Sequence, residues 1–193
     1  MLEFKILLGA LAAIVALSAY APYFWNTLTG KTKPHAFSWL AWGVLGSVAF
    51  AAQVAGKGGA GSWVTGFTAI SCFVIFMLAL VKGERRFAFF DWFCLMAAFV
   101  AIMLWYFTKT PLFSVILVTV ADVIAFLPTF RKGYYRPHEE TAATFALSGT
   151  KFFLSLLALE TYTVTTWLYP ASLVMTNSLF VTLLYMRRKQ VAK

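Results

Sequence analysis

Two charged side chains lie far inside apolar stretches of the sequence, where a charge is costly. Asp122 lies about ten residues into the stretch 111–130, and Lys151 lies about ten residues into 141–159. A charged group at the centre of a bilayer costs about 2.5–3.5 kcal/mol on insertion scales, so each is a candidate functional residue. Either the two form a buried ion pair that only fixes packing, or one of them titrates or binds a charged solute. Because transporter sites lie at this depth, we favour the solute site.

Three further side chains are candidates for the same substrate-binding site. Asn177 lies in the middle of the stretch 163–186, where it would bind a solute or form a hydrogen bond between helices. Trp42 is the most deeply placed of the seven tryptophans, and Ser71 lies inside another apolar stretch. The other tryptophans need only an anchoring role, because indole rings prefer the boundary between lipid headgroups and hydrocarbon. The predicted site therefore consists of Asp122, Lys151, Asn177, Trp42 and Ser71.

Three prolines lie within or at the ends of apolar stretches, and we predict that they act as hinges. Pro22, Pro128 and Pro170 each lack a backbone N–H, so each removes one helical hydrogen bond and permits bending. In a protein that moves between states these positions would be hinges. In a static protein they would be ordinary kinks, and the sequence leaves both interpretations open.

The composition indicates a protein that uses lipid as its solvent. Of 193 residues, 61% are hydrophobic and 12% are charged, which is more apolar surface than a soluble domain of this length can bury. The net charge of +9 does not indicate nucleic-acid binding, because the basic residues lie in short turns between apolar stretches. Cys72 and Cys94 both lie inside apolar stretches, which favours buried thiols over a disulfide.

The apolar stretches predict seven transmembrane helices. A helix needs roughly 20 apolar residues to cross a hydrocarbon core of about 30 Å. Turns rich in Gly, Pro and Lys separate the stretches, except for a weak break near Glu160. Backbone that is not helical cannot face hydrocarbon, so the expected fold is an all-α membrane protein. The predicted spans are 4–25, 36–56, 61–81, 89–107, 111–130, 141–159 and 163–186.

The basic residues predict how these helices cross the membrane. Lys5, Lys57 and Lys109 would lie on one side, and Lys151 lies inside a span. Cytoplasmic loops carry the excess of Lys and Arg, so the amino terminus is predicted outside and the carboxyl terminus in the cytoplasm. The cytoplasmic side would carry the other twelve: Lys31, Lys33, Lys82, Arg85, Arg86, Arg131, Lys132, Arg136, Arg187, Arg188, Lys189 and Lys193.

An internal repeat divides the seven helices into three, one and three. A proline followed by a basic turn and a Pro-His pair occurs first at Pro22 and 34–35, and again at Pro128 and 137–138. A triplet of helices ends on the opposite side from where it began, so one extra crossing must precede the second triplet. We therefore predict two parallel three-helix bundles, 1–83 and 111–193, joined by a connector helix within 84–110.

The proline segments resemble those of the SWEET and PQ-loop superfamily, which also contains the KDEL receptor and the Pnu-type vitamin transporters. The segments are Ala21-Pro22-Tyr23-Phe24 and Leu127-Pro128-Thr129-Phe130, and the second is similar to the Pro-Thr-Phe of SWEET sequences. The resemblance implies a 3-1-3 transporter with a substrate-site asparagine on the last helix, at Asn177. Sugar-transporting SWEETs carry a second asparagine where this chain has Cys72, so a simple sugar is not the expected solute.

The sequence favours a transporter over an enzyme. It contains no nucleotide loop, metal-ligand pattern or nucleophile constellation, so neither a cofactor nor a metal is expected. We expect a facilitator or proton-coupled carrier of a small polar or zwitterionic solute, located in a bacterial inner membrane. The alternatives are a receptor that binds a short peptide without transport, as the KDEL receptor does, and a scaffold without a solute site. The expected partners are a small-molecule substrate and the lipid bilayer, with no nucleic acid, and homo-oligomerisation is left open.

Overall fold

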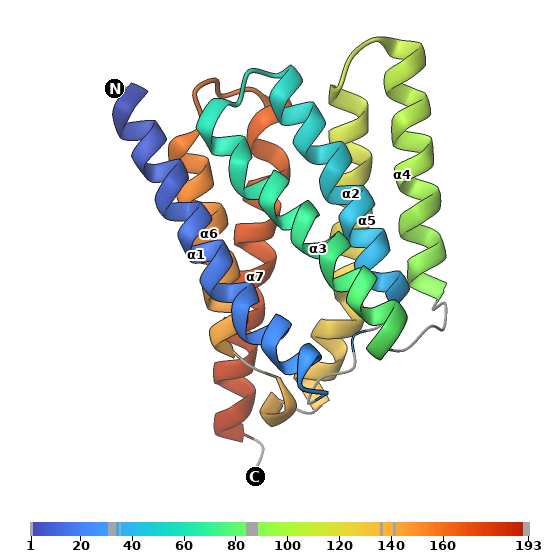
Figure 1. Ribbon diagram of the computed structural model, residues 1–193, viewed down its shortest axis with the longest axis vertical. Coiled ribbons are helices and arrows are strands. Elements are labelled where there is room, and N and C mark those ends of the chain that lie inside the picture. Colours follow the sequence, from blue (N-terminus) through green and yellow to red (C-terminus); the bar gives the residue numbers. More distant parts are fainter. Residues whose placement is uncertain are drawn as a thin grey trace.

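The computed structural model describes residues 2–30, 34, 36–83, 89–135, 137–140 and 142–190, with every side chain among them except those at 90, 128, 132 and 139. These residues form helices and no strand (Figure 1). The elements are α1 (Leu2–Leu28), α2 (Ala36–Ala55), the 3₁₀ helix η1 (Gly59–Ser62), α3 (Trp63–Lys82), α4 (Phe89–Thr108), α5 (Leu112–Tyr135), the 3₁₀ helix η2 (Pro137–Glu139), α6 (Ala142–Ala158) and α7 (Val164–Gln190).

Six of the helical segments in the described part of the chain are long and apolar enough to cross a membrane. They are α1, α2, η1 together with α3, most of α4, α5 and α7. The remaining helix, α6, is apolar but has only 17 residues. Length and composition therefore indicate an integral membrane protein with an all-helical fold.

The ends of the helices differ from the predicted spans mainly in α5 and α7. The sequence predicted ends at residues 130 and 186, whereas the helices continue to Tyr135 and Gln190. The added residues include Arg131 and Arg187–Lys189. Backbone hydrogen bonding does not stop where the hydrocarbon ends, so a polar residue marks the edge of the apolar stretch and not the end of the helix.

Small residues fill the interior, and large apolar residues face outward. The buried core contains many alanines, among them Ala12, Ala49 and Ala98, which are all fully buried. On the outside, Leu7 is 67% exposed and Phe107 is 76% exposed. Small residues allow helix backbones to approach closely, which is how helices associate in lipid, where there is no hydrophobic driving force between them.

Helix α3 packs against both α1 and α2, and helix α7 packs against both α5 and α6. In addition, α1 packs against α6 and α2 packs against α5, with smaller contacts of α2 with α7 and of α3 with α6. Helix α4 packs against α2 and α5 at the edge of the bundle (Figure 1). We call α1–α3 the first half and α5–α7 the second half.

The two ends of the bundle carry different turns and helix ends. The amino-terminal end carries residue 2, the turn between α2 and α3, and the turn between α6 and α7 (Figure 1). The carboxyl-terminal end carries the end of α3, the end of α5 and the end of α7. Chain reversals use residues with positive φ, including Gly59 at +60° in the turn before α3. Glycine adopts this conformation without steric cost.

Candidate functional site

Lys151 of α6 is buried against the first half of the molecule. Its side chain is 1% exposed. The Nζ atom donates hydrogen bonds to the hydroxyls of Tyr20 in α1, at 3.3 Å, and of Thr68 in α3, at 3.0 Å. It also lies 4.4 Å from the centroid of the Tyr20 ring, where the ring face attracts a cation. The ammonium group is therefore stabilised by neutral groups that belong to two helices of the other half.

Asp122 of α5 is buried separately and has a different partner. Its side chain is 6% exposed, and its carboxyl group has a side-chain hydrogen bond with Tyr169 of α7. Asp122 and Lys151, both of which the structure describes, form no ion pair with each other. The sequence left two interpretations open, a buried ion pair or a solute site. The structure does not contain the ion pair.

One cysteine lies close to both charges. The thiol of Cys72 in α3 has a side-chain hydrogen bond with Tyr20, and it interacts electrostatically with both Asp122 and Lys151. Cys72 and Cys94 are free, buried thiols, as the sequence predicted. The two charges and the four side chains around them come from five helices of both halves. We call these six residues the buried polar cluster: Tyr20, Thr68, Cys72, Asp122, Lys151 and Tyr169.

The other three predicted binding residues do not join the charges through hydrogen bonds. Asn177 is 3% exposed, and its Nδ2 atom donates to the carbonyl of Leu173 in its own helix, at 2.7 Å. Trp42 is half-buried and its ring packs edge-on against Trp39, with centroids 5.5 Å apart. Ser71 is half-buried in α3.

The packing of Asn177 explains part of its position. A Cβ atom added to Gly149 of α6 would lie 3.5 Å from the Cβ atom of Asn177, so the two helices meet closely there. A side-chain amide that bonds within its own helix satisfies its polar group during such packing. This geometry fits the interpretation of Asn177 as a packing residue better than that of a solute ligand.

Pro170 creates an acceptor that the first half of the molecule uses. Pro170 lies inside α7 and lacks the N–H that would bond to the carbonyl of Thr166. The Nε2 atom of Gln53 in α2 donates to that carbonyl at 2.9 Å. The hydrogen bond missing from the helix is thus replaced by one between the two halves.

The other two predicted hinges lie in the first helix of each half. Pro22 lies inside α1. Position 128 lies within the bounds of α5, and the Pro128 side chain is outside those that the structure describes.

Sequence reasoning missed three polar residues near these charges and one buried carboxyl elsewhere. Tyr20, Thr68 and Tyr169 supply the hydrogen-bond partners of the charges. A tyrosine within an apolar stretch was the available signal, since buried tyrosines usually have a partner for the hydroxyl. Asp91, in the first turn of α4, is 3% exposed and accepts a hydrogen bond from Ser38 at 2.6 Å.

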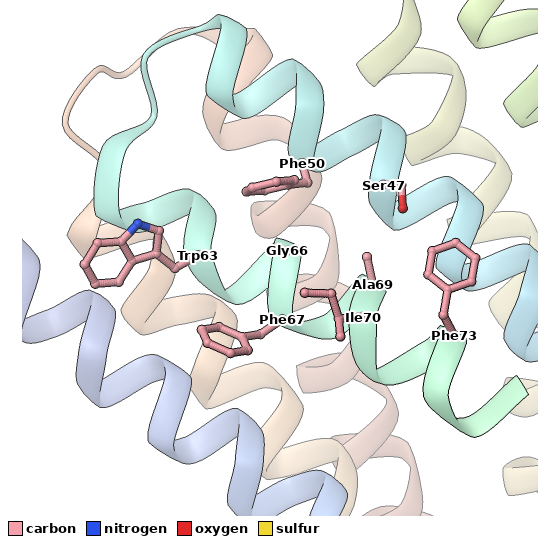
Figure 2. A pocket seen from close by; sticks show the side chains of 8 residues that line it. All are labelled: Ser47, Phe50, Trp63, Gly66, Phe67, Ala69, Ile70 and Phe73. Atoms are coloured by element: carbon pink, nitrogen blue, oxygen red, sulfur yellow. The ribbon is translucent and has the colours of Figure 1, made fainter. Parts of the chain in front are cut away.

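A separate apolar groove lies between α2 and α3 on the outer surface (Figure 2). Its volume is about 270 Å³, and Trp63, Phe67 and Ile70 on its rim are between 40% and 61% exposed. The groove exists because two glycines leave room: a Cβ atom at Gly66 would lie 3.0 Å from the Phe50 ring, and one at Gly43 would lie 3.1 Å from a neighbouring phenylalanine ring. None of the predicted binding residues lines it.

The arrangement can bind charge but shows no metal centre. Among the described residues, no group of three or more His, Cys, Asp or Glu side chains could hold a metal ion. An ammonium and a carboxylate that are both dehydrated and not paired with each other can each accept an opposite charge from a solute.

In comparisons with known proteins, no family model, no curated protein and no solved structure matches this chain.

Proposed function

We propose that this protein is a membrane transporter, a facilitator or a proton-coupled carrier, that moves a small polar solute by alternating access of two three-helix bundles. The observation that carries the proposal is the pair of buried, opposite and unpaired charges, Asp122 and Lys151. Burying an ion costs several kcal/mol unless it is paired. A purely structural role would be served best if the two neutralised each other, yet each is bound to hydroxyl groups instead.

The helix contacts support a 3-1-3 arrangement. Exchanging α1 with α5, α2 with α6 and α3 with α7 converts every major contact between these helices into another observed contact. The α1–α3 contact becomes α5–α7, and the α1–α6 contact becomes α5–α2. Only α4 has no counterpart, which is the property of a connector helix. We further propose that the protein lies in a bacterial inner membrane with its amino-terminal end outside, which the distribution of basic residues in the sequence supports for the orientation.

The two charges favour a zwitterionic solute such as an amino acid. A solute carboxylate would pair with the ammonium of Lys151, and a solute ammonium would pair with the carboxylate of Asp122. Both pairings replace neutral hydroxyl partners by charged ones, and charge-assisted hydrogen bonds are roughly twice as strong. The solute itself would then offset much of the cost of burying the two side chains.

Solute flux into proteoliposomes tests the proposal. A panel of amino acids, vitamins and sugars is offered to wild-type protein, to Asp122→Asn and to Asp91→Asn. Asp122→Asn keeps the shape and loses the charge, so we expect flux to fall at least about tenfold, which corresponds to about 1.4 kcal/mol of lost binding. Asp91→Asn, a buried carboxyl outside the cluster, should transport like wild type.

Three results would count against the proposed function or its site. Flux of no solute, or equal flux through wild type and Asp122→Asn, contradicts the proposed site. Saturable binding of a solute or short peptide without flux would instead support the receptor that the sequence left as an alternative.

A further inference from the structure

We infer that the turn between α2 and α3 and the turn between α6 and α7 form a gate at the amino-terminal end, and that this gate is closed in the structure. The first turn comprises residues 56–62 and the second comprises residues 159–163. They belong to different halves of the molecule and dock directly onto each other. The inference rests on the proposed function, because a gate between two halves controls access only if the halves move.

Hydrogen bonds join the two turns through backbone groups. The Glu160 N–H donates to the carbonyl of Gly58 at 3.1 Å, and the Ala60 N–H donates to Oε1 of Glu160 at 3.4 Å. The Ser155 hydroxyl donates to the carbonyl of Gly61 at 2.6 Å. The Ala60 N–H lies in the first turn of η1, where backbone donors lack a partner within their own helix.

Glycines allow the two turns to approach closely. A Cβ atom at Gly61 would lie 2.7 Å from the backbone N of Leu159 and 2.7 Å from the backbone O of Ser155. One at Gly56 would lie 2.8 Å from the Cγ2 atom of Thr166. Any larger residue at these positions would push one half away from the other. The backbone contact is therefore specific to the closed arrangement.

The carboxyl-terminal end is built differently. There the Lys82 side chain donates to the carbonyl of Leu28, within the first half. Arg187 donates to the carbonyl of Tyr134, within the second half. A Cβ atom at Gly133 would collide with the Phe180 ring, again within the second half. These three contacts between described residues each lie within one half, whereas those at the amino-terminal end join the halves.

The gate covers the buried polar cluster on one side. Ser155 lies one helical turn from Lys151, toward the amino-terminal end of the bundle, and both project from the face of α6 that meets the first half. Separating Ser155 from Gly61 would thus open a path from the amino-terminal side toward Lys151. The described state is closed to that side.

Labelling of the native Cys72 tests the gate without any solute. In a Cys94→Ala background, Cys72 is the one remaining thiol, and it lies in the cluster behind the gate. Cells or right-side-out vesicles are treated with a membrane-impermeant maleimide. We expect Gly61→Ala to raise the labelling rate about tenfold, a shift of about 1.4 kcal/mol toward the open state. Gly46→Ala is the control, because its Cβ atom would make an ordinary contact at 3.4 Å.

A disulfide across the gate provides the second measurement, in case Gly61→Ala does not fold. The pair Gly56→Cys and Thr166→Cys brings together positions within reach of a disulfide. Its oxidation should prevent labelling of Cys72 from outside, and reduction should restore it. The pair Gly46→Cys and Ala69→Cys, whose Cβ atoms would lie 3.4 Å apart within the first half, should leave labelling unchanged.

The outcomes separate the gate from the proposed function. Equal labelling of a folded Gly61→Ala and the background protein, or labelling that persists across the oxidised gate, overturns the gate. Labelling as expected with no flux of any solute keeps the gate and overturns transport. Flux that survives oxidation of the gate pair contradicts the gate even where transport is established.

Discussion

Lys151 is the residue whose environment says most about function. It is nearly fully buried, and the Asp122 carboxylate does not pair with it. Its partners, the hydroxyls of Tyr20 and Thr68, lower the cost of burying the ammonium without removing it. A residue that costs stability in this way is typical of a binding site, where function is kept at the expense of stability.

Replacing Lys151 by methionine should therefore separate stability from function. Lys151→Met keeps a long apolar side chain and removes the buried cation, so we expect the free energy of unfolding to rise by about 1 kcal/mol or more. Solute binding should be lost in the same variant. Thermal unfolding in detergent and equilibrium solute binding measure the two effects.

The control for this prediction is Lys109→Met. Lys109 lies at the turn before α5 and its ammonium packs on the exposed Tyr106 ring, 4.4 Å from the centroid. Its loss should leave binding intact and shift stability little, because exposed charge contacts contribute little. A Lys151→Met variant that is less stable than wild type but still binds solute would show that the ammonium serves packing.

The sequence was sufficient to find the two charges but not their partners. Asp122 and Lys151 stand out because charge is rare within apolar stretches. The Lys151 partners lie 131 and 83 positions away along the chain, at Tyr20 and Thr68. Which hydroxyl meets which charge depends on the rotation of each helix about its axis, and the length of an apolar stretch carries no information on that rotation.

At the scale of elements, α7 depends on α2 for one of its hydrogen bonds. Gln53 is fully buried and supplies the donor that Pro170 cannot. Among the described residues, the Oε1 atom of this amide has no hydrogen-bond partner, so only its donor group is used. A buried amide with one unsatisfied atom is costly. The hydrogen bond that the Nε2 group of Gln53 donates therefore explains why a glutamine is at this position.

A double-mutant cycle should detect this dependence. Pro170→Ala restores an N–H to α7, so the Thr166 carbonyl regains a partner within its own helix. We expect Gln53→Leu to cost about 1 kcal/mol less in the Pro170→Ala background than in wild type. Unfolding in mixed detergent measures the free energy of unfolding of wild type, of the two single variants and of the double variant. Strictly additive effects would show that Gln53 and Pro170 act independently.

The positions of the helices were predicted well, and the reason is specific to membranes. Polar turns such as 56–59 and 108–111 end the apolar stretches, and the structure ends α2 and α4 at Ala55 and Thr108. The weak break near Glu160 also proved to be a turn, between α6 and α7. Its signal was weak because the turn contains neither glycine nor proline, and Glu160 instead bonds to the turn between α2 and α3.

At the scale of the whole molecule, the internal repeat in the sequence predicts two halves that are built alike. The repeat was visible because proline and basic turns recur with similar spacing around Pro22 and Pro128. The sequence did not show that α3 packs against both α1 and α2, or that α7 packs against both α5 and α6. Every helix in such a bundle has apolar residues all around, so its pattern does not indicate its neighbours.

Fusion reporters test the predicted orientation of the whole chain. With the carboxyl terminus in the cytoplasm, a green fluorescent protein fused after Lys193 should fluoresce, and alkaline phosphatase there should be inactive. Alkaline phosphatase fused after Lys57 or Thr108 should be active, because both turns are predicted outside. Active phosphatase after Lys193 would reverse the orientation and place the gate on the cytoplasmic side.

The shortness of α6 has a consequence for the surrounding lipid. Its 17 residues span about 25 Å at 1.5 Å per residue, against about 30 Å of hydrocarbon. Leu147, Phe153 and Leu157 are exposed on this helix, as side chains that face lipid would be. In a bilayer, a helix this short is accommodated by local thinning, by flanking side chains that extend to the interface or by oligomerisation, at a cost of a fraction of a kcal/mol per Å. A thicker membrane therefore increases the mismatch at α6, the helix that carries Lys151 at its centre and Ser155 near its end.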